Sequence, residues 1–179
     1  MKTILLLLLL LSFLCCQLFA QNDSSFINWS AERKLAWNDF KAQPPNNDSR
    51  AAVTNTHLGF SYYFSNAKLT HKVECRFVKT NSWGLVKTDF ILQHEQAHFD
   101  IAEIFARRLH KAILEYPFNS KSYRNDLDLI YEKIANAESD FQKQYDTETN
   151  HSLNKQKQVA WLKKIAAQLE ELNSFSNYR

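Results

Sequence analysis

The sequence predicts an α+β domain in which a small antiparallel sheet is followed by three helices. Apolar and polar residues alternate over 52–64 and again over 69–77, which is the pattern of half-buried strands. Further along, apolar residues recur at helical intervals, which predicts helices over residues 88–115, 122–145 and 154–172. Strands that precede the helices, rather than alternate with them, are typical of the α+β class.

Residues 1–20 have the features of a secretory signal peptide. Lys2 precedes an uninterrupted apolar run from Ile4 to Leu14, and we expect cleavage after Ala20. As a helix this run would be about 16 Å long, whereas the hydrocarbon core of a membrane is about 30 Å thick. We therefore expect an exported protein, periplasmic or secreted, with no stable membrane span after signal cleavage.

The cysteines raise one alternative for the leader. Cys15 and Cys16 follow the apolar run as a lipid-modified cysteine would, but Leu14 and Cys15 are not the small residues expected just before such a site. A lipoprotein is therefore the minority interpretation. Once the leader is removed, Cys75 is the only remaining cysteine, so no disulfide can form within the chain.

The mature chain is long enough for one compact domain, residues 48–179, preceded by a lead-in segment over 21–47. The lead-in combines a short helix-like stretch, 30–40, with a loop, 43–47, whose prolines cannot continue a helix. We consider that it could also cover the functional site. Without Lys2 the chain has 21 Lys and Arg against 19 Asp and Glu, a balance that indicates no nucleic-acid partner. The oligomeric state is left open.

The two predicted strands form a hairpin through residues 65–68. Each strand places its large apolar side chains on one face, and these are Leu58, Phe60, Tyr62 and Phe64 on the first strand and Leu69, Val73, Cys75 and Phe77 on the second. The hairpin therefore has one face for packing against the helices.

The first predicted helix carries the motif His94-Glu95-Gln96-Ala97-His98, of the form His-Glu-x-x-His. Residues four apart lie on one face of a helix, so His94 and His98 can bind the same metal ion. Zinc held by three protein ligands lowers the pKa of a bound water to about 7, and a nearby carboxylate can take its proton. The motif predicts one zinc ion per chain, with Glu95 as the general base of a hydrolase.

The rest of this helix supports the assignment. Thr88 or Asp89 can cap its amino terminus, and Pro117 can end it. Glu103 and Arg107 are four residues apart, so we expect them to form an ion pair on the outer surface.

A catalytic zinc needs a third protein ligand, and the motif helix does not offer one. The candidates elsewhere in the chain are His57, His71, His110, Glu138, Asp146 and His151. His110 lies about 18 Å along the same helix from His98 and cannot reach the ion. His57 and His71 fit ordinary polar positions of the hairpin.

Glu138 and His151 remain as the main alternatives for the third ligand. Glu138 lies on the helix after the motif, and His151 stands at the end of that helix close to two useful side chains. Asp146 could orient an imidazole, and Tyr145 could donate a hydrogen bond to a developing oxyanion.

Several short segments of the chain form a recognisable set. They are Leu35-Ala36-Trp37-Asn38-Asp39-Phe40, Ala51-Ala52-Val53-Thr54, Ser82-Trp83, the run from His94 to Ile101, the run from Ala106 to Leu109, and Tyr145-Asp146-x-x-Thr149-x-His151 with Gln158 and Trp161 beyond. This set resembles a bacterial family catalogued as domain of unknown function 922, whose members are presumed to be secreted zinc-dependent proteases. The resemblance implies a zincin-like fold and favours His151 over Glu138 as the third ligand. This chain departs from it at Ser152, where glycine is expected.

The leading functional hypothesis is an exported zinc metallopeptidase that hydrolyses a peptide or protein substrate. Its zinc ligands would be His94, His98 and His151, with Glu95 and Tyr145 as catalytic residues. The alternatives are a non-catalytic envelope module that retains the fold, and a hydrolase acting on an amide or ester outside proteins. Intact Glu95 argues against the first alternative, because a purely structural zinc has no use for a general base.

Overall fold

The computed structural model describes residues 25–66 and 68–178, and it has the predicted α+β architecture. A three-stranded antiparallel sheet has the order β1-β4-β3, with β1 at Phe26–Asn28, β4 at Lys68–Val78 and β3 at Thr56–Ser65. A separate two-stranded sheet pairs β2, Ala52–Val53, with β5, Trp83–Gly84. The expected signal peptide and its two cysteines lie outside the described residues.

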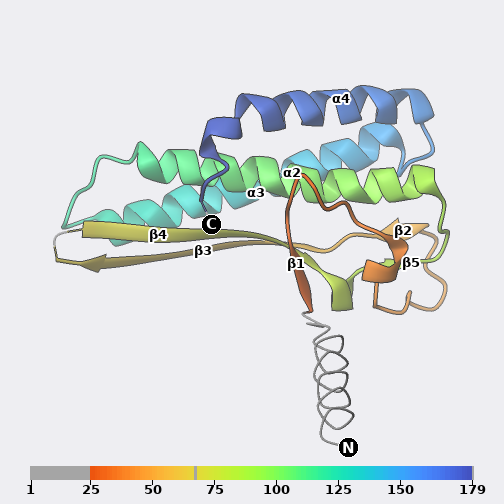
Figure 1. The fold of residues 1–179 in the computed structure, drawn as a ribbon, viewed down its shortest axis with the longest axis horizontal. Coiled ribbons are helices and arrows are strands. Elements are labelled where there is room, and N and C mark those ends of the chain that lie inside the picture. Colours follow the sequence, from red (N-terminus) through yellow and green to blue (C-terminus); the bar gives the residue numbers. More distant parts are fainter. Residues whose placement is uncertain (1–24, 67, 179) are drawn as a thin grey trace, which may run out of the picture.

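The helices cover one face of the larger sheet (Figure 1). They are α2 at Asp89–Leu114, α3 at Tyr123–Thr149 and α4 at Lys155–Glu171. Helix α2 is the central element, since it contacts β3, β4, α3 and α4. Figure 1 shows α4 on the side of α2 away from the sheet. Within the described residues, no helix combines the length and apolar character needed to cross a membrane.

The predicted hairpin is confirmed. Strands β3 and β4 pair antiparallel from Thr56 opposite Phe77 to Ser65 opposite Lys68. The alternating apolar side chains of both strands face the helices, where Val73, Cys75 and Phe77 are fully buried. The predicted first strand over 52–64 is divided into β2 and β3, which begins at Thr56, while β4 extends one residue beyond the predicted 69–77 at each end.

The expected helix over residues 30–40 is wrong. Only a single turn of 3-10 helix forms there, Trp37–Asp39, because side chains bind backbone N–H groups that a helix would need. Asp39 accepts a hydrogen bond from the backbone N–H of Ala36 (2.8 Å), and Gln96 of α2 accepts one from that of Leu35 (2.7 Å). The rest of the segment is irregular, and it follows a strand, β1, that the sequence analysis did not predict.

The expected position of the Glu103–Arg107 ion pair on the outer surface is also wrong. The pair forms, with 2.9 Å between Arg107 Nε and Glu103 Oε1, but both side chains are buried. Arg107 also donates to the backbone carbonyl of Leu169 at the end of α4, and the hydroxyl of Tyr178 donates to Glu103. The carboxyl-terminal residues and α4 cover this face of α2. The periodicity of the α2 sequence alone cannot predict this contact, because the covering residues lie far along the chain.

Candidate metal centre

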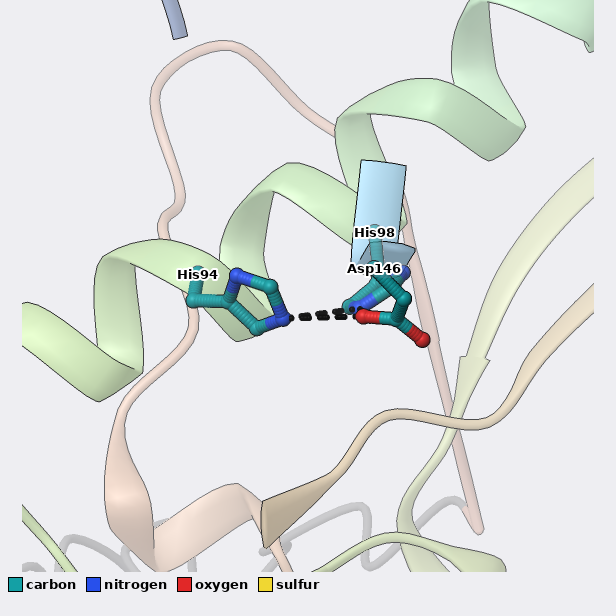
Figure 2. A group of neighbouring side chains, drawn as sticks. All are labelled: His94, His98 and Asp146. Carbon is teal, nitrogen blue, oxygen red and sulfur yellow. Dashed lines mark hydrogen bonds and ion pairs between the residues drawn. The ribbon is translucent and has the colours of Figure 1, made fainter. Parts of the chain in front are cut away.

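The two motif histidines lie on a regular part of α2. Thr88 caps the helix, as expected, because its hydroxyl oxygen accepts a hydrogen bond from the backbone N–H of Ile91 at 3.2 Å. His94 and His98 are one turn apart and face the carboxyl-terminal half of α3, which supplies Asp146 (Figure 2). His94 is buried, and the other two side chains are partly buried.

Three ligand atoms meet at this point. Asp146 Oδ1 lies 3.1 Å from His94 Nε2 and 3.1 Å from His98 Nε2, and the two nitrogens are 3.2 Å apart. A tetrahedral zinc ion about 2.0–2.1 Å from its N and O ligands requires those ligands to be about 3.3 Å apart. The spacing of the three atoms is therefore close to that of three corners of a zinc coordination sphere.

The hydrogen bonds around His98 determine which of its nitrogens carries a proton. The side-chain amide of Gln142 donates from Nε2 to the backbone carbonyl of His98 (2.9 Å), so its oxygen, Oε1, faces His98 Nδ1 at 2.6 Å. An oxygen can only accept, so Nδ1 must be the protonated nitrogen. In neutral His98 the lone pair of Nε2 therefore points at the carboxylate of Asp146, an arrangement that is favourable only with a cation or a second proton between them.

The close approach of His94, His98 and Asp146 also shifts the pKa values of His98 and Asp146. Burial acts to lower the pKa of His98, but the hydrogen bond with Asp146 and the negative charge of Glu95 outweigh it, and the pKa is raised. Burial acts to raise the pKa of Asp146, but hydrogen bonds with His94 and His98 outweigh it, and the pKa is lowered. The group thus favours positive charge between its members, which either protons or a metal ion can supply.

Glu95 lies beside this group and is ready to accept a hydrogen bond. Its side chain is buried, and Oε2 has no hydrogen-bond partner among the described residues. The hydroxyl of Thr54 donates to the backbone carbonyl of Glu95 at 3.2 Å, which ties the loop after β2 to the motif. A buried carboxylate oxygen without a donor is costly unless a water or substrate group binds it.

All of these residues line one cavity of about 410 Å³. One wall is the segment 50–56, which includes β2, and the opposite wall comes from Gln142, Asp146, His151 and Ser152 at the end of α3. Residues 25–49 do not line the cavity, so the described part of the lead-in segment does not cover it. Glu95 and the three residues that carry the ligand atoms therefore share one cavity.

The structure brings together Asp146, rather than His151 or Glu138, with the two motif histidines. His151 Nδ1 is 3.6 Å from Asp146 Oδ1, and its side chain is 64% exposed. Glu138 is one turn before Gln142, with its Oε1 3.5 Å from Gln142 Nε2, and it is not a member of the group. The sequence analysis counted Asp146 as a candidate ligand but favoured it as an orienting residue.

A sequence signal for the α3 side of the site does exist. Gln142, Tyr145, Asp146 and Thr149 are spaced three or four residues apart, so they share one face of the helix. Tyr145 is fully buried, and its ring stacks on that of His94 with 4.6 Å between centroids. Its hydroxyl points at the backbone carbonyl of His94, 3.5 Å away, and the side chain does not line the cavity. In this position Tyr145 supports His94.

Two motif residues that the sequence analysis left without a role hold the back of the helix. Asp100 Oδ1 accepts hydrogen bonds from the indole N–H of Trp29 (2.6 Å) and from the side-chain amide of Gln96 (2.9 Å). Gln96 in turn binds the backbone N–H of Leu35. The lead-in segment is thereby attached to the side of α2 opposite the histidines, and the polar character of these two positions is explained by this contact.

The remaining candidate histidines lie away from the group. His57 is exposed on β3, while His71 Nε2 and His110 Nδ1 are 2.8 Å apart in a contact between β4 and α2. Burial lowers the pKa of both His71 and His110, and the neighbouring His110 lowers that of His71 further. One of the two rings must donate to the other, so the contact requires at least one neutral histidine.

This pair is expected to make the fold sensitive to acid. Because each folded pKa lies below the ordinary value of 6.5, the stabilisation is complete above that pH and is lost as pH falls through the lowered values. The difference in melting temperature between the wild type and a His71→Gln variant should shrink between about pH 7.5 and pH 5. A difference that stays constant over this range would contradict the prediction.

The chain leaves α3 in an unusual backbone conformation. Three consecutive residues have positive φ, namely Asn150 (47°), His151 (48°) and Ser152 (73°). Left-handed backbone costs an L-residue about 1–2 kcal/mol, whereas glycine adopts it freely. This explains why glycine is expected at position 152, whose side chain is buried here.

Ser152→Gly should therefore stabilise the protein. The substitution removes the strain of the left-handed backbone at position 152. Glycine also gives the unfolded chain more freedom, which offsets part of this effect, so the net gain in the free energy of unfolding is about 0.5–1 kcal/mol. Urea denaturation measures it. Ser61→Gly in the middle of β3 is the matched control, and it should destabilise the protein instead. Destabilisation by both substitutions would contradict the prediction.

The fold and the site together define an α+β protein whose central helix carries a His-Glu-x-x-His motif facing a carboxylate on the next helix. The chain belongs to the family described as bacterial protein of unknown function (DUF922), whose model matches residues 21–152. The match includes the lead-in segment, the sheet and all the cavity residues. Comparisons with curated proteins and with solved structures gave no significant match.

Proposed function

We propose that the protein is an exported zinc-dependent metallopeptidase. The observation that carries the proposal is the convergence of His94 Nε2, His98 Nε2 and Asp146 Oδ1 at separations of 3.1–3.2 Å. Beside them lies a carboxylate oxygen of Glu95 that has no hydrogen-bond partner in the part of the chain that the structure describes. Zinc is the metal that best suits two imidazoles and a carboxylate oxygen in a tetrahedral arrangement with one position open.

In the proposed mechanism, zinc held by these residues would supply a Lewis acid toward water and a substrate carbonyl. The residues of the chain do the rest. Glu95 accepts a proton from the attacking water and returns it to the amine that leaves. Gln142 holds His98 with Nε2 toward Asp146, and Tyr145 supports the ring of His94. His151, whose Nδ1 lies 3.6 Å from Asp146 Oδ1, would serve as a further ligand or as a contact for the substrate.

The proposal is tested on the mature protein, residues 21–179. After removal of metal with a chelator and reconstitution, plasma mass spectrometry should find close to one zinc per chain. The loaded protein should cleave members of a diverse peptide library, detected by mass spectrometry, and a chelator should stop the cleavage until zinc is added back. Zinc binding without cleavage of peptides would instead favour a binding module. Failure to bind zinc would overturn the proposal.

A further inference from the structure

Arg50 is a positively charged residue at one end of the cavity wall formed by residues 50–56. Arg50 precedes the segment that leads into β2, and it is the only lysine or arginine among the described residues that line the cavity. Its side chain is about half exposed, at 53%. Both carboxylates of the cavity, Asp146 and Glu95, contribute to a raised pKa of Arg50, after the larger effect of its hydrogen bond with Asp48. Arg50 therefore lies within the electric field of the site.

The side chain of Arg50 is held in one orientation. Asp48 accepts hydrogen bonds from Arg50 Nε (2.9 Å) and Nη2 (2.5 Å), and also from its backbone N–H (2.9 Å). On another side, the guanidinium lies over the ring of Trp83, 5.5 Å from its centroid. Trp83 is buried in β5, which pairs with β2, so the small sheet fixes the position of the cation.

This arrangement leaves one binding edge of the guanidinium available. A guanidinium has five N–H donors, and it can bind a carboxylate either through Nε and Nη2 or through Nη1 and Nη2. Asp48 occupies the first edge, while Nη1 has no acceptor among the described residues. Because the side chain is already ordered, a second carboxylate would bind with little further loss of conformational freedom.

We propose that Arg50 recognises a carboxylate of the substrate at the edge of the active-site cavity. The proposal rests on the peptidase function above and gives it a substrate class, peptides that carry an acidic side chain or a free terminal carboxylate near the cleaved bond. Glu95 repels the same group, so the two charges together orient the peptide with its carboxylate away from the general base. Arg50 is thus a specificity-determining residue.

The test uses three pools of randomised peptides that differ only in charge. The first contains glutamate and an amidated carboxyl terminus, the second replaces glutamate by glutamine, and the third has glutamine with a free carboxyl terminus. Wild-type protein should prefer at least one carboxylate-bearing pool over the second by about 10- to 100-fold in kcat/KM, the range for hydrogen bonds to charged groups. The first and third pools distinguish a side-chain carboxylate from a terminal one.

In Arg50→Gln this preference ratio should fall to near one. In Arg50→Lys it should take an intermediate value, because lysine keeps the positive charge but lacks the paired N–H donors that bind both oxygens of a carboxylate. Arg124→Gln, which removes one positive charge from the distant start of α3, is the control and should keep the wild-type ratio. A ratio near one in the wild type, or one that survives in Arg50→Gln, would overturn the proposal.

Binding is measured separately on the zinc-loaded Glu95→Gln protein, in which most turnover is expected to be lost. Calorimetric affinities for the three pools should show the same dependence on Arg50. If no pool is cleaved but the carboxylate pools bind in an Arg50-dependent way, the peptidase function fails and the anion site stands. If binding does not distinguish the pools, the anion site fails whatever the enzyme cleaves.

Discussion

Replacing Asp146 with alanine is expected to weaken zinc binding by more than about 100-fold, beyond the range for residues that only orient a ligand. The substitution removes the oxygen that lies 3.1 Å from both histidine nitrogens, and it leaves two imidazoles, which is too few for a stable zinc site. Competition with a chromophoric chelator measures the affinity. Circular dichroism and thermal unfolding of the metal-free forms establish that the variant folds.

His151→Ala is the matched control because it removes the neighbouring candidate ligand. Since the His151 side chain is 64% exposed, its loss should reduce zinc affinity by less than about tenfold. Glu138→Ala should have a smaller effect, because Glu138 reaches the group only through Gln142. If His151→Ala lost the metal while Asp146→Ala retained it, the third ligand would be the histidine that the family resemblance implies.

Glu95→Gln should abolish most peptide cleavage while leaving zinc in place. Glutamine has the size of glutamate but cannot accept the proton of the attacking water, and general-base catalysis contributes about 10²- to 10⁴-fold to a rate. The substitution does not touch the three ligand atoms, so the zinc content should stay near one per chain. Both quantities are measured on the same preparation.

Two observations keep this result interpretable. Glu132→Gln, on the exposed face of α3, makes the same chemical change outside the cavity and should leave cleavage unaltered. Equal turnover by the wild type and Glu95→Gln would remove Glu95 from the mechanism. Loss of zinc from Glu95→Gln would mean that Glu95 acts on the metal rather than on water.

Local sequence patterns predicted most of the fold. The hairpin follows from the alternation over residues 52–64 and 69–77, and α2 follows from apolar periodicity between a capping threonine and Pro117. The short strands β1 and β5 were missed because their two or three residues carry no period, and their pairing depends on partners far along the chain. The lead-in helix was predicted in error because tertiary hydrogen bonds replaced the local ones.

The sequence predicted the part of the site that lies on α2, but not the ligand from α3. His94, Glu95 and His98 lie within one turn of one helix, so spacing alone indicates that they act together. Asp146 comes from a second helix, and its place depends on how α3 packs across α2. Its neighbour His151 looks equally suitable in the sequence. Only the direction of the chain after Thr149, with three residues at positive φ, turns that histidine toward solvent.

The attachment of residues 29–35 to the back of α2 has a practical consequence for anyone preparing the protein. Trp29 and Leu35 hold Asp100 and Gln96, which share the helix with the histidines, so a shortened version that starts at the predicted domain boundary near residue 48 would lack these contacts. Such a version would give low metal content for reasons unrelated to the ligands. Expression boundaries should therefore keep Phe26 and everything after it, with any affinity tag placed upstream.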